Sequence, residues 1–261
     1  MAEIIGVAGC GRMGAGMLAN LQTSDFDARG FDIRPVSGVS NDIAAFCSGL
    51  TTLITVVRDA DETDALLFTE QAVISQTQTL QTIIICSTLS PNYVKGLRAQ
   101  VPDNITLIDA PMSGAKVKSD AGTLTFMVGG EPTAIMPLLR AMGAEIHPMG
   151  GYGAGMTAKV LNNLLAASHT AMTRLVLDWA DAAGVDEEKL LSLISTASGQ
   201  NWLASGFDDI EFARDGYAPD NTIGILVKDV AAALDTANGA DTTLPRAVQA
   251  AVRNLKPRIK P

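Results

Sequence analysis

Lys159 and Asn163 are the pair of side chains in this sequence best suited to acid–base chemistry. No proline occurs between Gly155 and Ala183, and glycine returns only at Gly184, so a helix of about 40 Å is predicted there. Residues four apart share one face of a helix. A lysine held away from water, or beside positive charge, has a lowered pKa and can take or return an alcohol's proton during hydride transfer. Asn163 could hold a substrate or orient the lysine.

The loop Gly9–Cys10–Gly11–Arg12–Met13–Gly14 predicts a dinucleotide site. It follows an apolar strand and opens a helix at the beginning of the chain. Gly9 permits the tight turn, Gly11 lets the backbone approach a pyrophosphate, and Gly14 lets the helix pack close to the strand. Free N–H groups and partial positive charge at the helix N-terminus would face the phosphates. The alternative is a tight strand-to-helix turn that binds no ligand.

Asp32 indicates which dinucleotide the loop prefers. It ends the second predicted strand, 18 residues after Gly14. A carboxylate there can accept hydrogen bonds from the adenosine ribose, and it would repel a 2′-phosphate. The sequence therefore favours NAD over NADP, although Arg34 weakens this preference because an arginine could accommodate the phosphate.

Ser87 and Thr88 directly follow the predicted strand 83–86. Ligands of open α/β sheets lie beyond the carboxyl ends of strands, so these hydroxyls are predicted to reach the nicotinamide or the substrate. Capping of a helix that begins near Pro91 explains them equally well, and the two interpretations are compatible.

The elements that must position these residues form two domains. Strands that alternate with helices predict a parallel α/β Rossmann domain over residues 1–152, and the rest, 153–261, is predicted to be an all-α domain that begins with the long helix. Predicted strands are 3–8, 27–31, 53–57, 83–86, 105–109, 123–128 and 146–149; predicted helices are 13–21, 62–67, 91–100, 132–142, 155–183, 187–196, 207–214, 225–237 and 245–254.

Composition limits the class of protein. A net charge of −9 disfavours nucleic acid and anionic membrane surfaces as partners. The three cysteines have no disulfide or zinc spacing, which fits a reduced cytoplasm, and no apolar run is long enough to cross a bilayer. Charged residues make up only 18%, and with long apolar helices this predicts a homodimer or homotetramer.

Four motifs together closely resemble the β-hydroxyacid dehydrogenase family, whose best-known members are 3-hydroxyisobutyrate dehydrogenases. Asp109-Ala-Pro-Met-Ser-Gly-Ala115, followed by Gly-Thr-Leu at 122–124, is similar to the family's substrate motif Asp-Ala-Pro-Val-Ser-Gly-Gly. The start of the chain is similar to the cofactor motif Gly-x-Gly-x-Met-Gly-x-x-Met-x-x-Asn-Leu. Residues 153–163 match Gly-x-Gly-x-x-x-Lys-x-x-Asn-Asn, and Lys228–Asp229 match a late Lys-Asp pair.

The resemblance implies roles for several residues. Ser113, Gly114 and Ala115 would bind the substrate carboxylate, and free N–H groups on that turn form a suitable nest. Lys159 would be the acid/base, with Asn162 beside Asn163 at the substrate. Lys228 would contact cofactor or substrate, although an ion pair with Asp229 or a neighbouring acid also explains it. The second domain would be like that of 6-phosphogluconate dehydrogenases.

Other residues are interpreted more conservatively. Trp202 could wall the substrate pocket or lie in the core. His147 and His169 lie outside the motifs and are predicted to be structural, and no cluster suggests a metal.

These features predict reversible NAD-linked oxidation of a short 3-hydroxy acid to its semialdehyde. Ala115 and Lys116, where the family motif continues with glycine, are similar to the glyoxylate and succinic semialdehyde reductase branch, which is one alternative with NADPH. A non-catalytic, cofactor-sensing binding protein is the other. Asn162 stands where 6-phosphogluconate dehydrogenases have histidine, and imine reductases replace the lysine, so both are disfavoured. The trimmed stretch 35–50 predicts a brief second helix.

Overall fold

The computed structural model describes residues 3–259 as two compact units joined through one helix. The N-terminal unit extends to Lys159 and the C-terminal unit begins at Val160, so the division falls inside helix α8 (Ala154–Ala182). The predicted boundary at 152/153 lies just before this helix. Each unit is described by itself.

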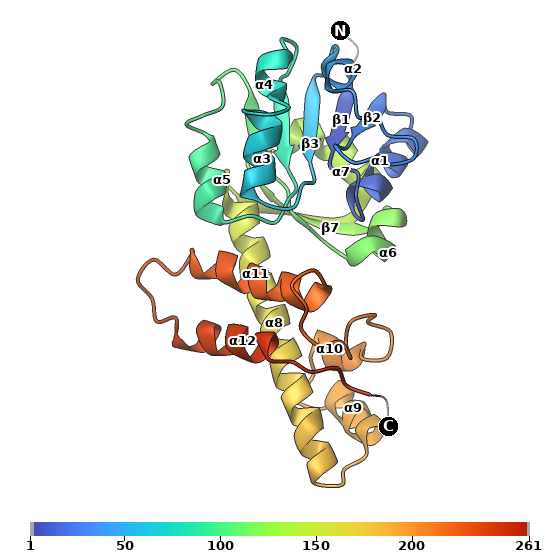
Figure 1. The fold of residues 1–261 in the computed structure, drawn as a ribbon, viewed down its shortest axis with the longest axis vertical. Helices are drawn as coiled ribbons and strands as arrows, with labels where there is room; N and C mark the ends of the chain where they lie inside the picture. The colour runs from blue at the N-terminus through green and yellow to red at the C-terminus, as the bar shows by residue number, and fades with distance from the viewer. Residues whose placement is uncertain (1–2, 260–261) are drawn as a thin grey trace. The chain divides into compact units, whose positions relative to one another are not determined.

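A predominantly parallel sheet forms the centre of the N-terminal unit (Figure 1). Five strands run parallel in the order β2 (Ala28–Phe31), β1 (Ile5–Ala8), β3 (Thr52–Thr55), β4 (Thr82–Ile85) and β5 (Thr106–Asp109). Their side chains alternate between two apolar cores: Ile54 and Ile84 belong to one, while Leu53 and Ile83 belong to the other. The predicted Rossmann arrangement is confirmed for this part of the sheet.

The far edge of the sheet departs from the predicted all-parallel arrangement. Strand β7 (Leu124–Gly129) is antiparallel to β5, and β8 (Gly143–Gly150) is parallel to β7. The connection between β5 and β7 contains the two-residue strand β6 (Met112–Ser113), which pairs antiparallel with β7 itself. This connection is therefore not a helical crossover, and the chain returns in the opposite direction.

Short helices cover the sheet. They are α1 (Gly14–Thr23), α2 (Ile43–Cys47), α3 (Ala60–Leu67), α4 (Val73–Gln76), α5 (Pro91–Leu97), α6 (Ala115–Asp120), the 3-10 turn Thr133–Ile135 and α7 (Met136–Met142). Helix α2 has five residues, as its trimmed sequence predicts. The three cysteines, Cys10, Cys47 and Cys86, are buried and free.

The C-terminal unit is helical, as predicted. Besides most of α8 it contains α9 (Glu187–Thr196), α10 (Trp202–Ser205), α11 (Thr222–Leu234) and α12 (Thr243–Arg253). The predicted helix 207–214 is wrong, because this segment is a series of turns. Its side chains are held by tertiary contacts instead: the Arg214 guanidinium lies 4.7 Å from the centre of the Phe207 ring and bonds back to Asp208.

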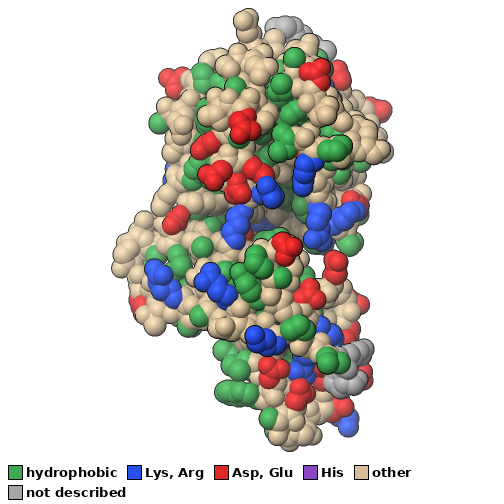
Figure 2. All heavy atoms as spheres, viewed as in Figure 1, with side chains coloured by type: hydrophobic (Ala, Val, Ile, Leu, Met, Phe, Trp, Pro, Cys, Tyr) green, Lys and Arg blue, Asp and Glu red, His purple; other side chains and the backbone are tan. Residues whose placement is uncertain are grey.

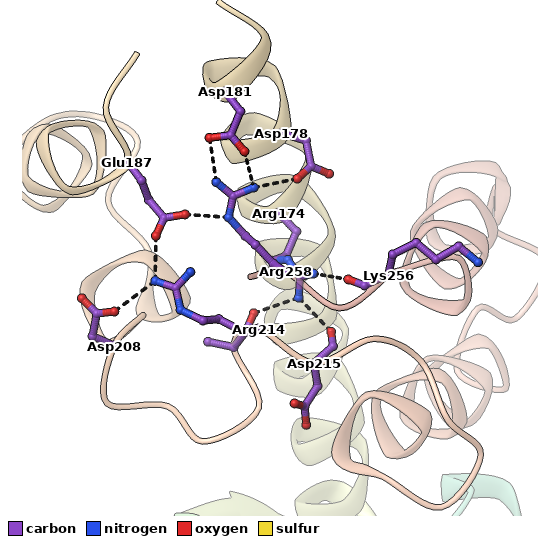
Figure 3. Close-up of polar contacts among 10 residues, drawn as sticks. Arg174, Asp178, Asp181, Glu187, Asp208, Arg214, Asp215, Lys256 and Arg258 are labelled. Carbon is purple, nitrogen blue, oxygen red and sulfur yellow. Dashed lines mark hydrogen bonds and ion pairs between the residues drawn. The ribbon is translucent and has the colours of Figure 1, made fainter. Parts of the chain in front are cut away.

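An arginine cluster holds residues 256–258 against the rest of this unit (Figure 3). Arg174 of α8 donates to the carbonyl oxygens of Ala213 and Asp215, at 2.9 and 2.8 Å, and to that of Lys256. Arg258 donates to Glu187 at 2.6 Å, and Arg214 reaches the other oxygen of that carboxylate at 2.6 Å. Glu187 is thus buried between two guanidinium groups. Among residues 3–259, no helix is long and apolar enough to cross a membrane.

Candidate active site

The glycines of the loop between β1 and α1 differ in how closely other atoms surround them. Gly9 has φ +92°, and a Cβ there would lie 2.5 Å from the Val56 carbonyl oxygen; a Cβ on Gly14 would lie 2.0 Å from the Gly9 oxygen. The fold itself therefore requires both. Gly11 is different, since a Cβ there would have only the Arg34 guanidinium nearby, at 3.4 Å. Gly11 is the position where open space lies directly against the backbone.

The remaining loop residues contribute through the backbone or pack inward. The Cys10 thiol is buried, and burial raises its pKa to about 12, so it stays protonated in the core. Met13 packs against the core, while the Arg12 side chain is exposed. Helix α1 has no side-chain cap at its N-terminus, unlike α3 and α5, which are capped by Asp59 and Ser90. These features fit a loop that receives phosphate oxygens on main-chain N–H groups.

Asp32 and Arg34 lie together at the end of β2. The Asp32 carboxylate is almost fully buried and accepts from the Arg34 backbone N–H at 2.9 Å and from its Nε at 3.2 Å. The Arg34 guanidinium is 63% exposed and lies over the open side of Gly11. Asp32, which is predicted to bind the ribose hydroxyls, and Arg34, which could accommodate a 2′-phosphate, therefore form one ion pair.

Ser87, two residues after the end of β4, has a buried hydroxyl at the carboxyl edge of the sheet. Its Oγ has no hydrogen-bond partner among the described residues. The alternative that Ser87 or Thr88 caps α5 is wrong, because Ser90 accepts from the Tyr93 N–H and makes that cap. An unsatisfied buried hydroxyl is costly, and a ligand amide or hydroxyl is one group that would satisfy it.

The substrate motif continues from β5 through β6 to α6. Ser113 and Gly114 are half-buried and Ala115 is exposed. Gly114 has φ +140° and Ala115 has φ +54°, so the alanine occupies the left-handed conformation that favours glycine. Ala115, which stands where the family motif has its second glycine, therefore adopts a backbone conformation that L-residues rarely take.

Asn20 and Ser119 tie the cofactor helix to the substrate motif. The Asn20 amide donates to the carbonyl oxygens of Gly16 and Ser119, at 2.7 and 2.8 Å. The buried Ser119 hydroxyl donates to the Met13 carbonyl at 2.6 Å. Gly16 permits this close contact, because a Cβ there would lie 2.8 Å from the Ser119 carbonyl carbon. Sequence reasoning missed this role, although Asn20 was already visible as a fixed position of the cofactor motif.

Asp109 is a second residue that sequence reasoning did not assign. Its carboxylate is fully buried and accepts from the backbone N–H groups of Gly153, at 2.6 Å, and Met156. Burial raises the pKa of Asp109, and the two N–H donors oppose that rise. Gly155 allows the approach, since a Cβ there would lie 2.3 Å from the Met127 carbonyl oxygen. The substrate motif therefore caps and positions the first turn of α8.

Lys159 and Asn163 lie one turn apart on α8, and both are buried. The Asn163 amide donates to Asp229 of α11 at 2.7 Å, and its oxygen accepts from the exposed Asn162 amide at 3.3 Å. Asp229 thus fixes which way the Asn163 amide points. Lysine is rarely buried, so a lysine only 7% exposed on a capped helix is a candidate for proton transfer.

Lys228 and Trp202, the remaining candidates, both lie in the C-terminal unit. Lys228 is exposed on α11, and the carboxylate of its neighbour Asp229 accepts a hydrogen bond from the Asn163 amide. Trp202 is 38% exposed and lies tilted against Phe212, with ring centres 6.0 Å apart, so it is neither fully buried nor free. Within residues 3–259, no group of three histidine, cysteine or acidic side chains is placed to hold a metal ion.

Comparisons with known proteins agree with this arrangement. Residues 4–151 match the family model described as the NAD binding domain of 6-phosphogluconate dehydrogenase. Residues 153–256 match the one described as NAD-binding of NADP-dependent 3-hydroxyisobutyrate dehydrogenase.

Individual relatives cover almost the whole chain. An L-threonate dehydrogenase of Cupriavidus necator is 28% identical over 94% of this chain and 87% of the relative. A 3-hydroxyisobutyrate dehydrogenase of Pseudomonas aeruginosa is 29% identical over 96% and 90%. The solved structure of a Mycobacterium tuberculosis 3-hydroxyisobutyrate dehydrogenase with L-serine has a TM-score of 0.81 and 25% identity, covering 98% of this chain and 97% of that one.

A Rossmann unit with an uncapped glycine-loop helix, followed by a helical unit, defines a nicotinamide-dependent dehydrogenase of the two-domain type. More specifically, the chain belongs to the β-hydroxyacid dehydrogenase family, whose members are NAD(P)-dependent 3-hydroxyacid dehydrogenases.

Proposed function

We propose that this enzyme interconverts a short 3-hydroxy acid and its semialdehyde, with Lys159 as the acid/base and NAD as the preferred cofactor. The observation that carries the proposal is the burial of Lys159 on a helix whose first turn is capped by the substrate motif through Asp109. The names of the relatives support the substrate class, because 3-hydroxyisobutyrate and L-serine both carry a carboxylate and a hydroxyl on the third carbon.

The residues divide the proposed reaction between them. Ser113 and the Gly114–Ala115 backbone would bind the carboxylate, and Asn162 and Asn163 would hold the substrate beside Lys159. In the oxidation direction, the neutral Lys159 amine would take the hydroxyl proton, and in reduction the protonated amine would return it. A bound nicotinamide supplies hydride acceptance or donation.

The cofactor half of the proposal rests on residues of the N-terminal unit. The open backbone at Gly11 and the uncapped start of α1 suit a pyrophosphate, with Cys10, Arg12 and Met13 lying along the same loop. Asp32 suits the ribose hydroxyls, while Ser87, with its unsatisfied Oγ, and Thr88 would contact the nicotinamide side. Lys228 would contact cofactor or substrate.

One alternative is reduction of glyoxylate or succinic semialdehyde with NADPH. Two observations favour it: the exposed Arg34 guanidinium beside Gly11, and Ala115 followed by Lys116 where the family motif has glycine. The two reactions differ in cofactor phosphate and in substrate length, so one activity panel separates them.

The test is that substrate-by-cofactor panel. The purified enzyme is mixed with 3-hydroxyisobutyrate, L-serine or L-threonate and either NAD or NADP, and the absorbance of reduced cofactor is followed. In the reverse direction, glyoxylate and succinic semialdehyde are offered with NADPH. Turnover of at least one 3-hydroxy acid, faster with NAD, is expected. Tight cofactor binding without turnover on any compound would contradict the proposal and favour a cofactor-sensing protein.

A further inference from the structure

The substrate turn runs directly into helix α6, which has a single buried side chain. The turn comprises Ser113, Gly114 and Ala115, and α6 begins at Ala115. Of the six described residues of this helix, Ser119 alone is buried, and Val117 is 79% exposed. Figure 2 shows lysine or arginine side chains lying over α6 at the surface. The helix therefore places no apolar side chain of its own in the core, and the contacts of Ser119 hold it in position.

Ser119 is held by the cofactor helix α1 through both its side chain and its backbone. Its hydroxyl donates to the Met13 carbonyl at 2.6 Å, and its own carbonyl accepts from the Asn20 amide at 2.8 Å. The Asn20 amide also donates to the Gly16 carbonyl at 2.7 Å, which fixes this amide on α1. Because α1 determines where Ser119 lies, the substrate turn at the start of α6 is positioned from the cofactor side.

The acceptor of the Ser119 hydroxyl belongs to a peptide group of the glycine loop. The Met13 carbonyl and the Gly14 N–H are the two ends of this peptide group. Gly14 is the first residue of α1, so its N–H has no partner within the helix and is one of the donors that a pyrophosphate would use. The peptide group would then donate to the cofactor at its nitrogen and accept from Ser119 at its oxygen. Hydrogen bonds linked in this way polarise and strengthen one another.

Ala115 shows why the substrate turn depends on this support. Its φ of +54° is a left-handed conformation, which costs free energy for any residue that has a Cβ. Such a conformation persists only where the surrounding structure imposes it. On the C-terminal side of Ala115 that structure is α6, whose position is set by Ser119. A change at Ser119 therefore reaches the backbone N–H groups that the proposed substrate carboxylate would meet.

We propose that Ser119 is a positioning residue that couples the cofactor site to the substrate turn. Cofactor bound at the Gly14 N–H strengthens the bond from Ser119 to Met13, holds α6 more firmly, and so raises the affinity of the turn for a carboxylate. By linkage, a bound carboxylate raises the affinity for the cofactor by the same factor. This coupling rests on the proposed function, which gives the loop its cofactor and the turn its carboxylate. Because one hydrogen bond carries the coupling, we expect a factor of about two to ten.

The reduced cofactor and a 3-hydroxy acid measure the coupling without turnover, because both are the reduced partners of the proposed reaction. The dissociation constant of NADH, or of NADPH if the panel favours it, is obtained by fluorescence with and without the 3-hydroxy acid that the panel turns over fastest. The ratio of these two constants should be about three or more in the wild type and less than about two in Ser119→Ala. Ser75→Ala, which removes an exposed hydroxyl bonded to the Ala72 carbonyl, is the matched control and should keep the wild-type ratio.

Ser119→Ala should fold like the wild type, since the Met13 carbonyl keeps a second hydrogen bond, from the Met17 N–H at 3.2 Å. Circular dichroism and the midpoint of thermal unfolding check this. A purely structural role would lower that midpoint and leave the ratio of dissociation constants unchanged. A wild-type ratio in Ser119→Ala, or no tightening by the acid in the wild type, would overturn the coupling. Turnover in the substrate panel is measured separately, so a failure of the proposed function is distinguishable from a failure of the coupling.

Discussion

The carboxylate of Asp109 lies 2.6 Å from the backbone nitrogen of Gly153, which joins the end of β5 to the start of α8. Two of the recognised motifs meet in this one hydrogen bond: the substrate motif begins at Asp109, and the lysine motif begins at Gly153. Because Lys159 is six residues further along the same chain, the position of the proposed acid/base depends on a residue that does not itself react.

Asp109→Asn should therefore impair both stability and turnover. The amide replaces one acceptor oxygen with an N–H₂ group that faces a backbone donor, so the cap is half lost and a buried donor is left unsatisfied. We expect a loss of about 1–3 kcal/mol in the free energy of unfolding and a lower kcat. Urea unfolding and steady-state kinetics measure the two effects. Asp103→Asn, whose carboxylate is exposed, is the control, and equal behaviour of the two variants would contradict the capping role.

Lys159→Ala should separate binding from chemistry. We expect cofactor binding to remain nearly intact, while turnover falls at least about 100-fold, as for loss of a general acid–base group. Fluorescence titration of the reduced cofactor and initial rates give the two numbers. Lys189→Ala on the exposed face of α9 should match the wild type in both. Unchanged turnover in Lys159→Ala would rule out its role as acid/base.

Asn163 and Asp229 should act as a unit. Asp229→Ala removes the acceptor that orients the Asn163 amide, so Asn163→Ala should cost less in an Asp229→Ala background than in the wild type. A double-mutant cycle on kcat/KM is expected to give a coupling energy of about 0.5–3 kcal/mol. Asp220→Ala, at an exposed position before α11, is the control, and its double-mutant cycle with Asn163→Ala should show no coupling. Additive losses for the Asn163–Asp229 pair would mean that Asp229 does not position the amide.

The sequence predicts local elements of this fold better than contacts between distant parts of the chain. The glycine loop and the strand that ends at Asp32 follow from local pattern, because a strand, a turn and a helix are specified within about thirty residues. The antiparallel β7 and the turns at 207–214 were predicted wrongly, since both depend on contacts between distant residues, such as β6 with β7 and Arg214 with Phe207. Asp109, Asn20 and Ser119 were missed for the same reason. Their partners are main-chain groups far along the chain, which no residue pattern reveals.

Arg34 should control the use of NADP. Its exposed guanidinium can pair with a 2′-phosphate, whereas NAD offers the neighbouring Asp32 only hydroxyl groups. Arg34→Glu is expected to lower kcat/KM for NADP about tenfold or more, equivalent to at least about 1.4 kcal/mol, and to change that for NAD much less. Arg58→Glu, an exposed arginine after β3, is the charge-matched control. If Arg34→Glu lowers kcat/KM equally for NAD and NADP, Arg34 does not discriminate between the two cofactors.

Glu187 should make the C-terminal unit sensitive to acid. Burial alone would raise the pKa of Glu187, but hydrogen bonds and attraction from Arg214 and Arg258 outweigh it and hold the pKa below its ordinary value of 4.5. A carboxyl whose folded-state pKa is lowered contributes stability above its unfolded pKa, and this contribution is lost as the pH falls through the folded value. The wild type should therefore lose stability below about pH 4.5 more steeply than Glu187→Gln.

At pH 7 the wild type should be more stable to unfolding than Glu187→Gln. Glu187→Gln removes the carboxylate that Arg214 and Arg258 share. Its free energy of unfolding should therefore be lower than that of the wild type by about 1–3 kcal/mol. Urea unfolding of both proteins at pH 7 and pH 4 measures the difference. Glu188→Gln, the exposed neighbour, should follow the wild type at both values. A gap between wild type and Glu187→Gln that does not narrow on acidification would show that the Arg214–Glu187–Arg258 contact stabilises the unit through packing and not through charge.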